Sequence, residues 1–241
     1  MRASQSKKVL VLFSGSYQRP DGLQAYLLRF GMNAVYVDND PVTGDASHDL
    51  NNDTFYHGLL DRVKSGEFAA IFAAPPCSTV SVSRFIHSDS SDDGGAPVVR
   101  DRKHKLGTPD VPEGHRRELR VANLIFDRTC ALLVEAFLVG TEFAVENPAD
   151  RGNPMDSEAF LTERHAPLWV LPMFVALQKR TGLSFATFPM CSFGAPYQKL
   201  TTVAFTAGFD AWLTSLSRLK CNHTSHGASA GGVKYDDGTW T

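Results

Sequence analysis

Two short segments of the sequence carry residues that could do covalent chemistry. Ala73-Ala-Pro-Pro-Cys-Ser78 places a cysteine just after an apolar run, and Val145-Glu-Asn-Pro148 places a glutamate at the end of another. A thiolate acts as a nucleophile when it is rigidly mounted and partly exposed, and a carboxyl group in the same cavity can handle a proton. We therefore expect Cys77 and Glu146 to work as a pair. Each alone is more typical of a structural thiol and of a capping or ion-pairing carboxylate.

A second set of residues could bind a nucleoside cofactor. Phe13-Ser-Gly-Ser16 follows the first apolar run, and a glycine there lets the backbone approach a ligand. Asp38 ends the next run, where a carboxylate can accept hydrogen bonds from a ribose, and Asp49 could lie beside the base. The G-x-G-x-x-G spacing of NAD sites is absent, which favours S-adenosylmethionine. The alternative is that both acids only cap turns.

Basic side chains gather in the segment that follows Cys77. Their position favours contact with the phosphates of a nucleic acid, although a solvated loop and helix face would explain them equally well. The net charge of the chain is −2, so any attraction to nucleic acid must be local. The segment holds Arg100, Arg102, Lys103, Lys105, Arg116, Arg117 and Arg120, with His104 and His115 among them.

Near the C-terminus, Cys221-Asn-His-Thr-Ser-His226 offers possible metal ligands, and Cys191 could be a fourth. Structural zinc sites usually take two pairs of ligands with recognisable spacing. The C-x-H-x-x-H pattern is not such an arrangement. The sequence therefore favours surface histidines beside a half-buried cysteine, and no metal is predicted.

The elements that must position these residues follow from the hydrophobic pattern. Continuous apolar runs are typical of strands buried on both faces, and they alternate with stretches of helical period. Because strand–helix–strand units form parallel sheets, we expect an α/β, Rossmann-like doubly wound sheet with its ligands at the carboxyl ends of the strands. The expected strands are 7–13, 33–37, 68–74, 142–146, 184–188 and 201–205, and the clearest expected helices are 23–30, 54–65 and 118–139.

The same pattern suggests how the chain is divided. We expect a cofactor-binding catalytic core over residues 1–150 and a small, irregular substrate-side lobe with closing strands over 151–226. The Gly- and Ser-rich tail, 227–241, is expected to be flexible. The polar stretch from Ser78 to Gly114 predicts a long mobile loop.

Composition excludes several classes of protein. The four cysteines among 241 residues are too few and too dispersed for a disulfide framework. The longest apolar runs, such as 131–139, fall far short of the ~20 residues that cross a bilayer. The run 9–13 is shorter than a signal-peptide core and lacks a small-residue cleavage site. We expect an intracellular protein that does not bind membranes.

In the order of its motifs, the sequence resembles the cytosine-C5 DNA methyltransferases, and looks closest to their compact phage-type and protist-type relatives. That family arranges a Phe-x-Gly-x-Gly-like loop, an acid after the second strand, an acid ahead of the third, Pro-Cys, and Glu-Asn. This chain has, in the same order, Phe13-Ser-Gly-Ser16, Asp38, Asp49, Pro76-Cys77, Glu146-Asn147-Pro148 and a later Cys191-Ser-Phe-Gly-Ala-Pro-Tyr-Gln-Lys199.

The resemblance implies S-adenosylmethionine-dependent methylation of cytosine C5 in DNA, most simply duplex DNA, with the target base flipped out of the helix. Cys77 would add to C6 of the base while Glu146 assists at N3, and Lys199 and Thr201 would shape the substrate side. The residues implied at the cofactor are Phe13, Ser14, Gly15, Ser16, Asp38, Asp49 and Pro76. Those implied at the nucleic acid are Ser78, Arg84, Arg100, Arg102, Lys103, Arg116, Arg117 and Asn147.

The chain also departs from that family. It has no recognisable Gln-x-Arg-x-Arg segment and no late Gly-Asn-Ser segment, and only about 40 residues separate Pro148 from Cys191. Specific DNA interfaces bury about 1,000–2,500 Å² of protein, so a separate target-recognition protein could be required. Two alternatives stay open: a non-catalytic relative that binds nucleic acid or regulates a partner, and C5 methylation of RNA or of a free pyrimidine nucleotide.

Overall fold

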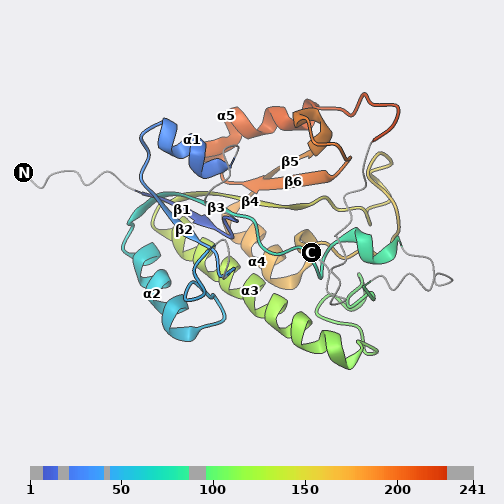
Figure 1. Ribbon diagram of the computed structural model, residues 1–241, viewed down its shortest axis with the longest axis horizontal. Helices are drawn as coiled ribbons and strands as arrows, with labels where there is room; N and C mark the ends of the chain where they lie inside the picture. The colour runs from blue at the N-terminus through green and yellow to red at the C-terminus, as the bar shows by residue number, and fades with distance from the viewer. Residues whose placement is uncertain (1–7, 16–21, 41–43, 87–95, 227–241) are drawn as a thin grey trace, which may run out of the picture.

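A six-stranded sheet forms the centre of the protein in a computed structural model that describes residues 8–15, 22–40, 44–86 and 96–226 (Figure 1). The strand order is β2-β1-β3-β4-β6-β5. Strands β2, β1, β3 and β4 are parallel, whereas β6 runs antiparallel to both of its neighbours. The strands are β1 (Lys8–Leu12), β2 (Ala34–Val37), β3 (Phe68–Ala73), β4 (Glu142–Pro148), β5 (Ser184–Pro189) and β6 (Leu200–Phe205).

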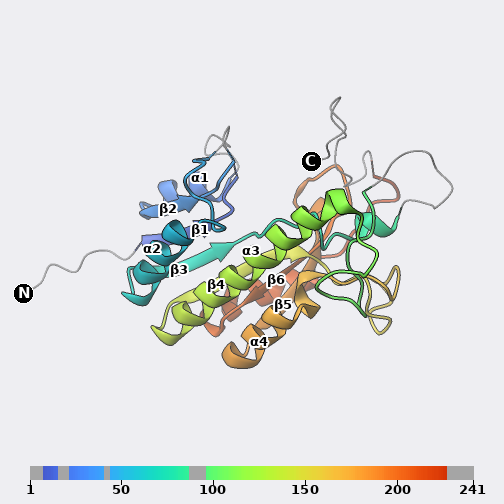
Figure 2. The same ribbon diagram turned by 90° about the horizontal axis from the view of Figure 1, so that it is seen from below.

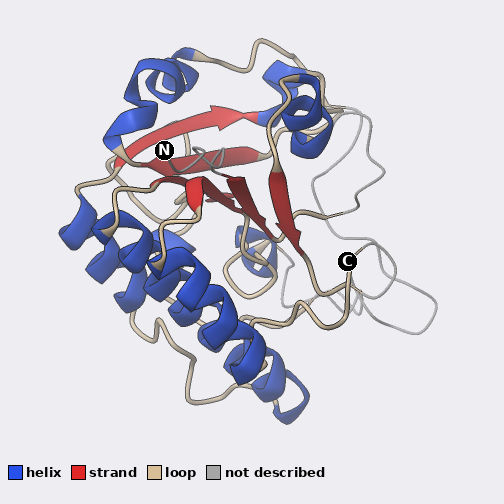
Figure 3. Ribbon diagram, turned by 90° about the vertical axis from the view of Figure 1, so that its left-hand side faces the viewer, coloured by secondary structure: helices blue, strands red, loops and turns tan. Residues whose placement is uncertain are grey.

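Helices cover both faces of the sheet, which confirms the doubly wound α/β fold expected from the sequence (Figure 3). Helices α2 (Asp53–Lys64), α3 (Glu113–Leu138) and α4 (Pro172–Thr181) lie on one face, with α4 packed along α3 (Figure 2). Helices α1 (Leu23–Arg29) and α5 (Asp210–Leu213) lie on the other. Short 3-10 segments complete the chain: η1 (Val82–Phe85), η2 (Leu168–Val170), η3 (Met190–Phe193), η4 (Ala207–Phe209) and η5 (Thr214–Arg218).

The alternation of side chains along the strands divides the core between these two faces. Leu10 and Ile71 are fully buried against α2, α3 and α4 in the main core. Val9 and Val11, which point the opposite way, pack with Leu27 of α1. Because apolar side chains are needed on both faces, these strands read as continuous apolar runs in the sequence.

The predicted loop after Cys77 is confirmed over the described residues 96–112, which form no helix or strand, but part of it is packed into the fold. Val99 and Val111 are buried and pack with Leu119 in a small core of their own. Helix α3 begins at Glu113 rather than at the predicted residue 118, since Glu113 pairs with Arg116 in a first turn that lacks an apolar pattern. The most polar part of the segment, 88–95, lies outside the described residues.

The C-terminal part of the chain completes the same sheet. Strands β5 and β6 belong to the expected lobe 151–226, yet β6 pairs with β4 over residues 144–148. The expected tail 227–241 lies outside the described residues. None of the helices in the described ranges combines the length and apolar character of a membrane span.

Candidate active site

Strands β3 and β4 bring Cys77 and Glu146 to the same edge of the sheet. The two strands are parallel neighbours, and Ala73 is in register with Val145. The Pro-Pro-Cys turn therefore begins level with Glu146. Asn147, which is 1% exposed, donates a hydrogen bond from Nδ2 to the backbone oxygen of Pro75 at 2.8 Å. Asn147 thus positions the turn from inside the protein, and is not exposed for the nucleic-acid contact expected of it.

Three more side chains fix the backbone that follows Cys77. Arg84 Nε donates to the carbonyl oxygen of Ser78 at 2.6 Å, and Arg100 Nε to that of Thr79 at 3.1 Å. His165 Nε2 lies 2.9 Å from the carbonyl oxygen of Val80. Consecutive carbonyls are therefore each held by a buried side chain from a different segment. Such support keeps a nucleophile in place, as a preorganised site requires.

The buried state of Arg84 and Arg100 corrects their expected role at phosphates. Arg84 is 8% exposed and also donates to Pro97 and Glu118, while Arg100 is 1% exposed and donates to Thr79 Oγ1 and Asn123 Oδ1. In both residues each of the three guanidinium nitrogens donates to a protein acceptor. Both residues stabilise the chain after Cys77 instead of facing solvent.

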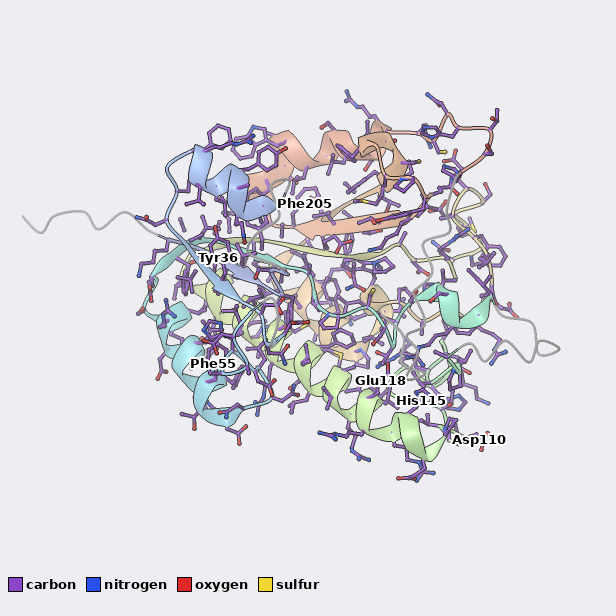
Figure 4. All side chains as sticks on the ribbon, viewed as in Figure 1. Tyr36, Phe55, Asp110, His115, Glu118 and Phe205 are labelled. Atoms are coloured by element: carbon purple, nitrogen blue, oxygen red, sulfur yellow. The ribbon has the colours of Figure 1, made fainter. Side chains whose placement is uncertain are left out.

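The remaining basic residues divide between ion pairs and exposed positions. Arg102 is half-buried and forms an ion pair with Asp150, whereas Lys103 and Arg117 are exposed. Arg116 is exposed and pairs with Glu113. Figure 4 shows His115 and Glu118 together near the start of α3, where His115 Nδ1 lies 3.0 Å from Glu118 Oε2. Exposed cations are therefore available beside residue 103 and at the N-terminal end of α3, and Ser78 is exposed next to Cys77.

A third candidate group, Lys199, reaches the Cys77–Glu146 edge from the strand on the far side of β4. Lys199 immediately precedes β6, and its Nζ lies 3.7 Å from Glu146 Oε1. The Glu146 side chain is 38% exposed, so the pair is open to a ligand. Thr201, which was expected on the substrate side, is buried in β6.

Opposing electrostatic effects act on the half-buried Cys77 thiol. Burial raises the pKa of Cys77, the Lys199 ammonium opposes that rise, and the Glu146 carboxylate adds to it. The resting thiol is therefore mostly protonated at neutral pH. Lys199 is the charge that favours the thiolate, and neutralising Glu146 by a proton or by a substrate hydrogen bond would favour it further.

The ends of β1 and β2 meet at the edge expected for a cofactor. Phe13 has a φ of 59°, a left-handed conformation that is strained for a bulky residue and often marks a functional turn. Gly15 has a φ of 66°, and its N–H donates to Asp38 Oδ2 at 2.8 Å. Ser14 lies between them with its hydroxyl on the oxygen of Gly15. Ser16 lies outside the described residues.

Asp49 and Pro76 occupy different settings from Asp38. Asp49 Oδ1 accepts hydrogen bonds from the backbone N–H and the side-chain Nδ2 of Asn51, both at 2.8 Å, just before α2. This contact is a turn of the kind that the alternative interpretation of both acids describes, and Asp38 Oδ1 accepts a similar hydrogen bond from the N–H of Asp40 at 3.0 Å. Pro76 is exposed and lies between Pro75, which is buried, and Cys77, which is half-buried.

His165 is a structural residue that the sequence did not reveal. It is completely buried, and its Nδ1 accepts a hydrogen bond from the N–H of Arg151 at 3.0 Å, which leaves Nε2 as the donor to Val80. The imidazole is therefore neutral and joins residues 151–165 to the Cys77 turn. A single histidine in a segment without periodicity gives no signal of such a role.

Acid should destabilise the protein through His165. Burial lowers the pKa of His165, although the Val80 hydrogen bond opposes the effect. In the unfolded chain a histidine has a pKa of about 6.5. The contribution of His165 to the free energy of unfolding is therefore complete above that pH, and it is lost as the pH falls toward the lower pKa of the folded state. We expect the melting temperature of the His165→Gln variant to fall less between pH 7 and 5 than that of the wild type. His57→Gln, at an exposed position of α2, should behave as the wild type; parallel curves for all three would contradict the assignment.

Comparisons with known proteins give structural likenesses at low sequence identity. No family model and no curated protein matches the sequence. The Dnmt2 methyltransferase of S. pombe matches with a TM-score of 0.42 and 12% identity over 83% of this chain and 50% of that one. A Spodoptera frugiperda DNMT2 mutant matches with a TM-score of 0.39 and 13% identity over 93% of this chain and 54% of that one. The Entamoeba histolytica methyltransferase EhMeth matches with a TM-score of 0.39 and 12% identity over 83% of this chain and 52% of that one. This chain spans about half the length of those structures, and similarity at this level assigns no activity.

Proposed function

We propose that the protein is an S-adenosylmethionine-dependent methyltransferase that acts on C5 of a pyrimidine, with cytosine in DNA as the substrate. One observation carries the proposal. The Cys77 turn is tied to the Glu146-Asn147 strand end through the Asn147–Pro75 hydrogen bond, and Lys199 lies against Glu146 at that edge. A nucleophile, a proton-handling carboxyl group and a cation thus come from three segments to one place.

The residues at the ends of β1 and β2 fit a nucleoside cofactor. The Asp38 carboxylate is half-buried beside the Gly15 turn, and such a group can accept hydrogen bonds from ribose hydroxyls. Phe13, Ser14 and Gly15 would line the same edge. We assign Asp49 and Pro76 to its border, Asp49 with one oxygen engaged by Asn51. S-adenosylmethionine bound there would supply an electrophilic methyl group.

Cys77, Glu146 and Lys199 would activate the base for methyl transfer. Cytosine C5 is a poor nucleophile, so Cys77 must first add to C6. The S–C6 bond forms as the electron pair of the C5–C6 double bond moves toward C5, while Glu146 donates a hydrogen bond or a proton at N3. Lys199 stabilises the thiolate before addition. After C5 has gained the methyl group, a base such as water would take the C5 proton, the C5–C6 double bond would reform, the Cys77 thiolate would leave, and any proton gained by N3 would return to Glu146.

The exposed cations supply the proposed contact with nucleic acid. We assign phosphate contacts to Lys103, Arg116 and Arg117, with Arg102 at the border because of its pair with Asp150. Arg84, Arg100 and Asn147 are left out because they are buried. Among the residues expected at the nucleic acid, the exposed cations are Lys103, Arg116 and Arg117. Such a small set would also suit a short single-stranded RNA loop, whose unstacked bases need no flipping, as a second candidate substrate.

Transfer of a labelled methyl group to matched substrates tests this proposal. The protein is mixed with labelled S-adenosylmethionine and duplex DNA, single-stranded DNA, RNA or free cytidine nucleotides, and products are identified by mass spectrometry. We expect 5-methylcytosine in DNA. Methylation of RNA alone would contradict DNA as the substrate but would support C5 methylation as the reaction. No transfer to any of them, with no binding of S-adenosylmethionine by calorimetry, would overturn the enzyme itself.

A further inference from the structure

Four possible metal ligands lie together at one end of the molecule, away from the Cys77 turn in the sequence. Cys191 belongs to η3, and the other three follow η5. Their ligand atoms all lie within 4.8 Å of one another, and they belong to Cys191, Cys221, His223 and His226. The fold thus brings a distant cysteine to the C-x-H-x-x-H segment.

Two distances measured from Cys221 Sγ match those of a tetrahedral site, and all four ligand atoms lie within 4.8 Å of one another. Zinc binds cysteine sulfur at about 2.3 Å and histidine nitrogen at about 2.0–2.1 Å, so neighbouring ligand atoms lie roughly 3.3–3.8 Å apart. Cys221 Sγ lies 3.6 Å from His223 Nδ1 and 3.3 Å from His226 Nε2. Two different ring nitrogens turn toward one sulfur, an arrangement that a metal ion at the centre would explain.

We propose that Cys191, Cys221, His223 and His226 bind one zinc ion. Two thiolates with two imidazoles suit zinc better than harder cations, which prefer oxygen. Four protein ligands leave no open position, so the site is structural rather than catalytic. The proposal does not depend on the methyltransferase activity.

The surroundings show what such a site would stabilise. Cys191 is buried, and its carbonyl oxygen accepts a hydrogen bond from Gly194, which has a φ of 87° and closes a tight turn. The segment 221–226, in contrast, is exposed or half-exposed throughout. Its other links to the fold are weak: Ser192 Oγ donates to the oxygen of Lys220 at 3.3 Å, and Lys220 forms an exposed ion pair with Glu158.

The metal would also brace the loop that carries Lys199. Residues 194–199 connect η3 to β6, and the Met190 N–H donates a hydrogen bond to the backbone oxygen of Lys199 at 2.9 Å. A zinc ion on Cys191 would therefore anchor one end of a loop whose other end places Lys199 beside Glu146.

Metal analysis of the full chain tests the proposal. The protein is purified without a histidine tag under reducing conditions, and zinc is measured by mass spectrometry. We expect about one zinc per chain, falling to less than about a tenth in Cys221→Ser and in His223→Asn, because the loss of one ligand weakens binding severely. Cys130→Ala and His57→Gln, which lie in α3 and α2, should retain the full zinc content.

Cobalt substitution reads out the ligands without relying on zinc stability. The wild type loaded with Co²⁺ should show the visible bands of a tetrahedral site and a thiolate charge-transfer band, which Cys191→Ser reduces. Circular dichroism checks that each variant is folded. A wild type that holds neither zinc nor Co²⁺ would overturn the proposal, as would full zinc content in a folded Cys221→Ser variant or a Cys191–Cys221 disulfide in its place.

Discussion

Replacing Cys77 by serine is expected to abolish covalent trapping of the protein on nucleic acid that contains 5-fluorocytosine. With S-adenosylmethionine present, C5 would gain the methyl group, and the fluorine on C5 could not then leave as a proton does, so the wild type should stop with Cys77 bonded to C6. A serine hydroxyl is far less acidic than a thiol and would not add to C6 at neutral pH. Methyl transfer to ordinary substrate should fall by at least roughly 10⁴-fold, as for other lost nucleophiles. Denaturing gels with labelled nucleic acid measure the adduct.

Cys130 provides the matched control. It is buried within α3, and burial raises the pKa of its thiol to about 12, so it should not react with a base. Cys130→Ala should therefore trap nucleic acid as the wild type does. An adduct that persists in Cys77→Ser, or that disappears in a folded Cys130→Ala protein, would show that Cys77 is not the nucleophile.

The strands and helices of the sheet were predictable because their signals are local. Strand β3 reads as an apolar run closed by Pro75-Pro76, and its observed end at Ala73 differs by one residue from the expectation. Helix α2 likewise shows one apolar face, and its N-cap Asn52 accepts a hydrogen bond from Phe55. The start of α3 was missed because residues 113–117 are polar and largely exposed, so hydrophobic periodicity does not detect them.

The meeting of Cys77 and Glu146 at one edge was also predictable, from topology alone. Parallel strands place their carboxyl ends on the same side, so two motifs at strand ends must be near neighbours once β3 and β4 pair. The supporting side chains were not predictable. Arg100 is stable in the interior because Thr79, Lys105 and Asn123 accept its hydrogen bonds, and two of those partners, Thr79 and Asn123, lie 21 and 23 residues away. A run of basic residues does not show which of them are buried.

These buried contacts change the physical picture of the segment after Cys77. A mobile loop would have to order on binding, and that ordering costs free energy. Here Arg84, Arg100 and His165 already hold the carbonyls of residues 78, 79 and 80. Cys77, the proposed nucleophile, is therefore followed by a backbone that is already held in place before any substrate arrives, and Asn147 ties the turn to the strand that carries Glu146.

The Glu146→Gln variant is the second sharp test, because it removes the acid while keeping the shape of the side chain. Glutamine can hydrogen-bond to a base but cannot give N3 a proton, so turnover should fall by about 10²–10⁴-fold. Binding of S-adenosylmethionine should be unchanged, since the proposed cofactor residues lie at the ends of β1 and β2. Single-turnover kinetics and calorimetry separate the two quantities.

Two further variants serve as controls for the Glu146→Gln result. Glu142→Gln alters the same strand four residues earlier, where the carboxylate accepts hydrogen bonds from Thr206 and Gly208, and it should affect stability more than turnover. Asp38→Asn should instead weaken the binding of S-adenosylmethionine, because it removes a carboxylate beside Gly15. If Glu146→Gln loses cofactor affinity instead, or keeps normal turnover, the carboxyl group does not act on the base. The ion pair between Glu146 and Lys199 would then be structural.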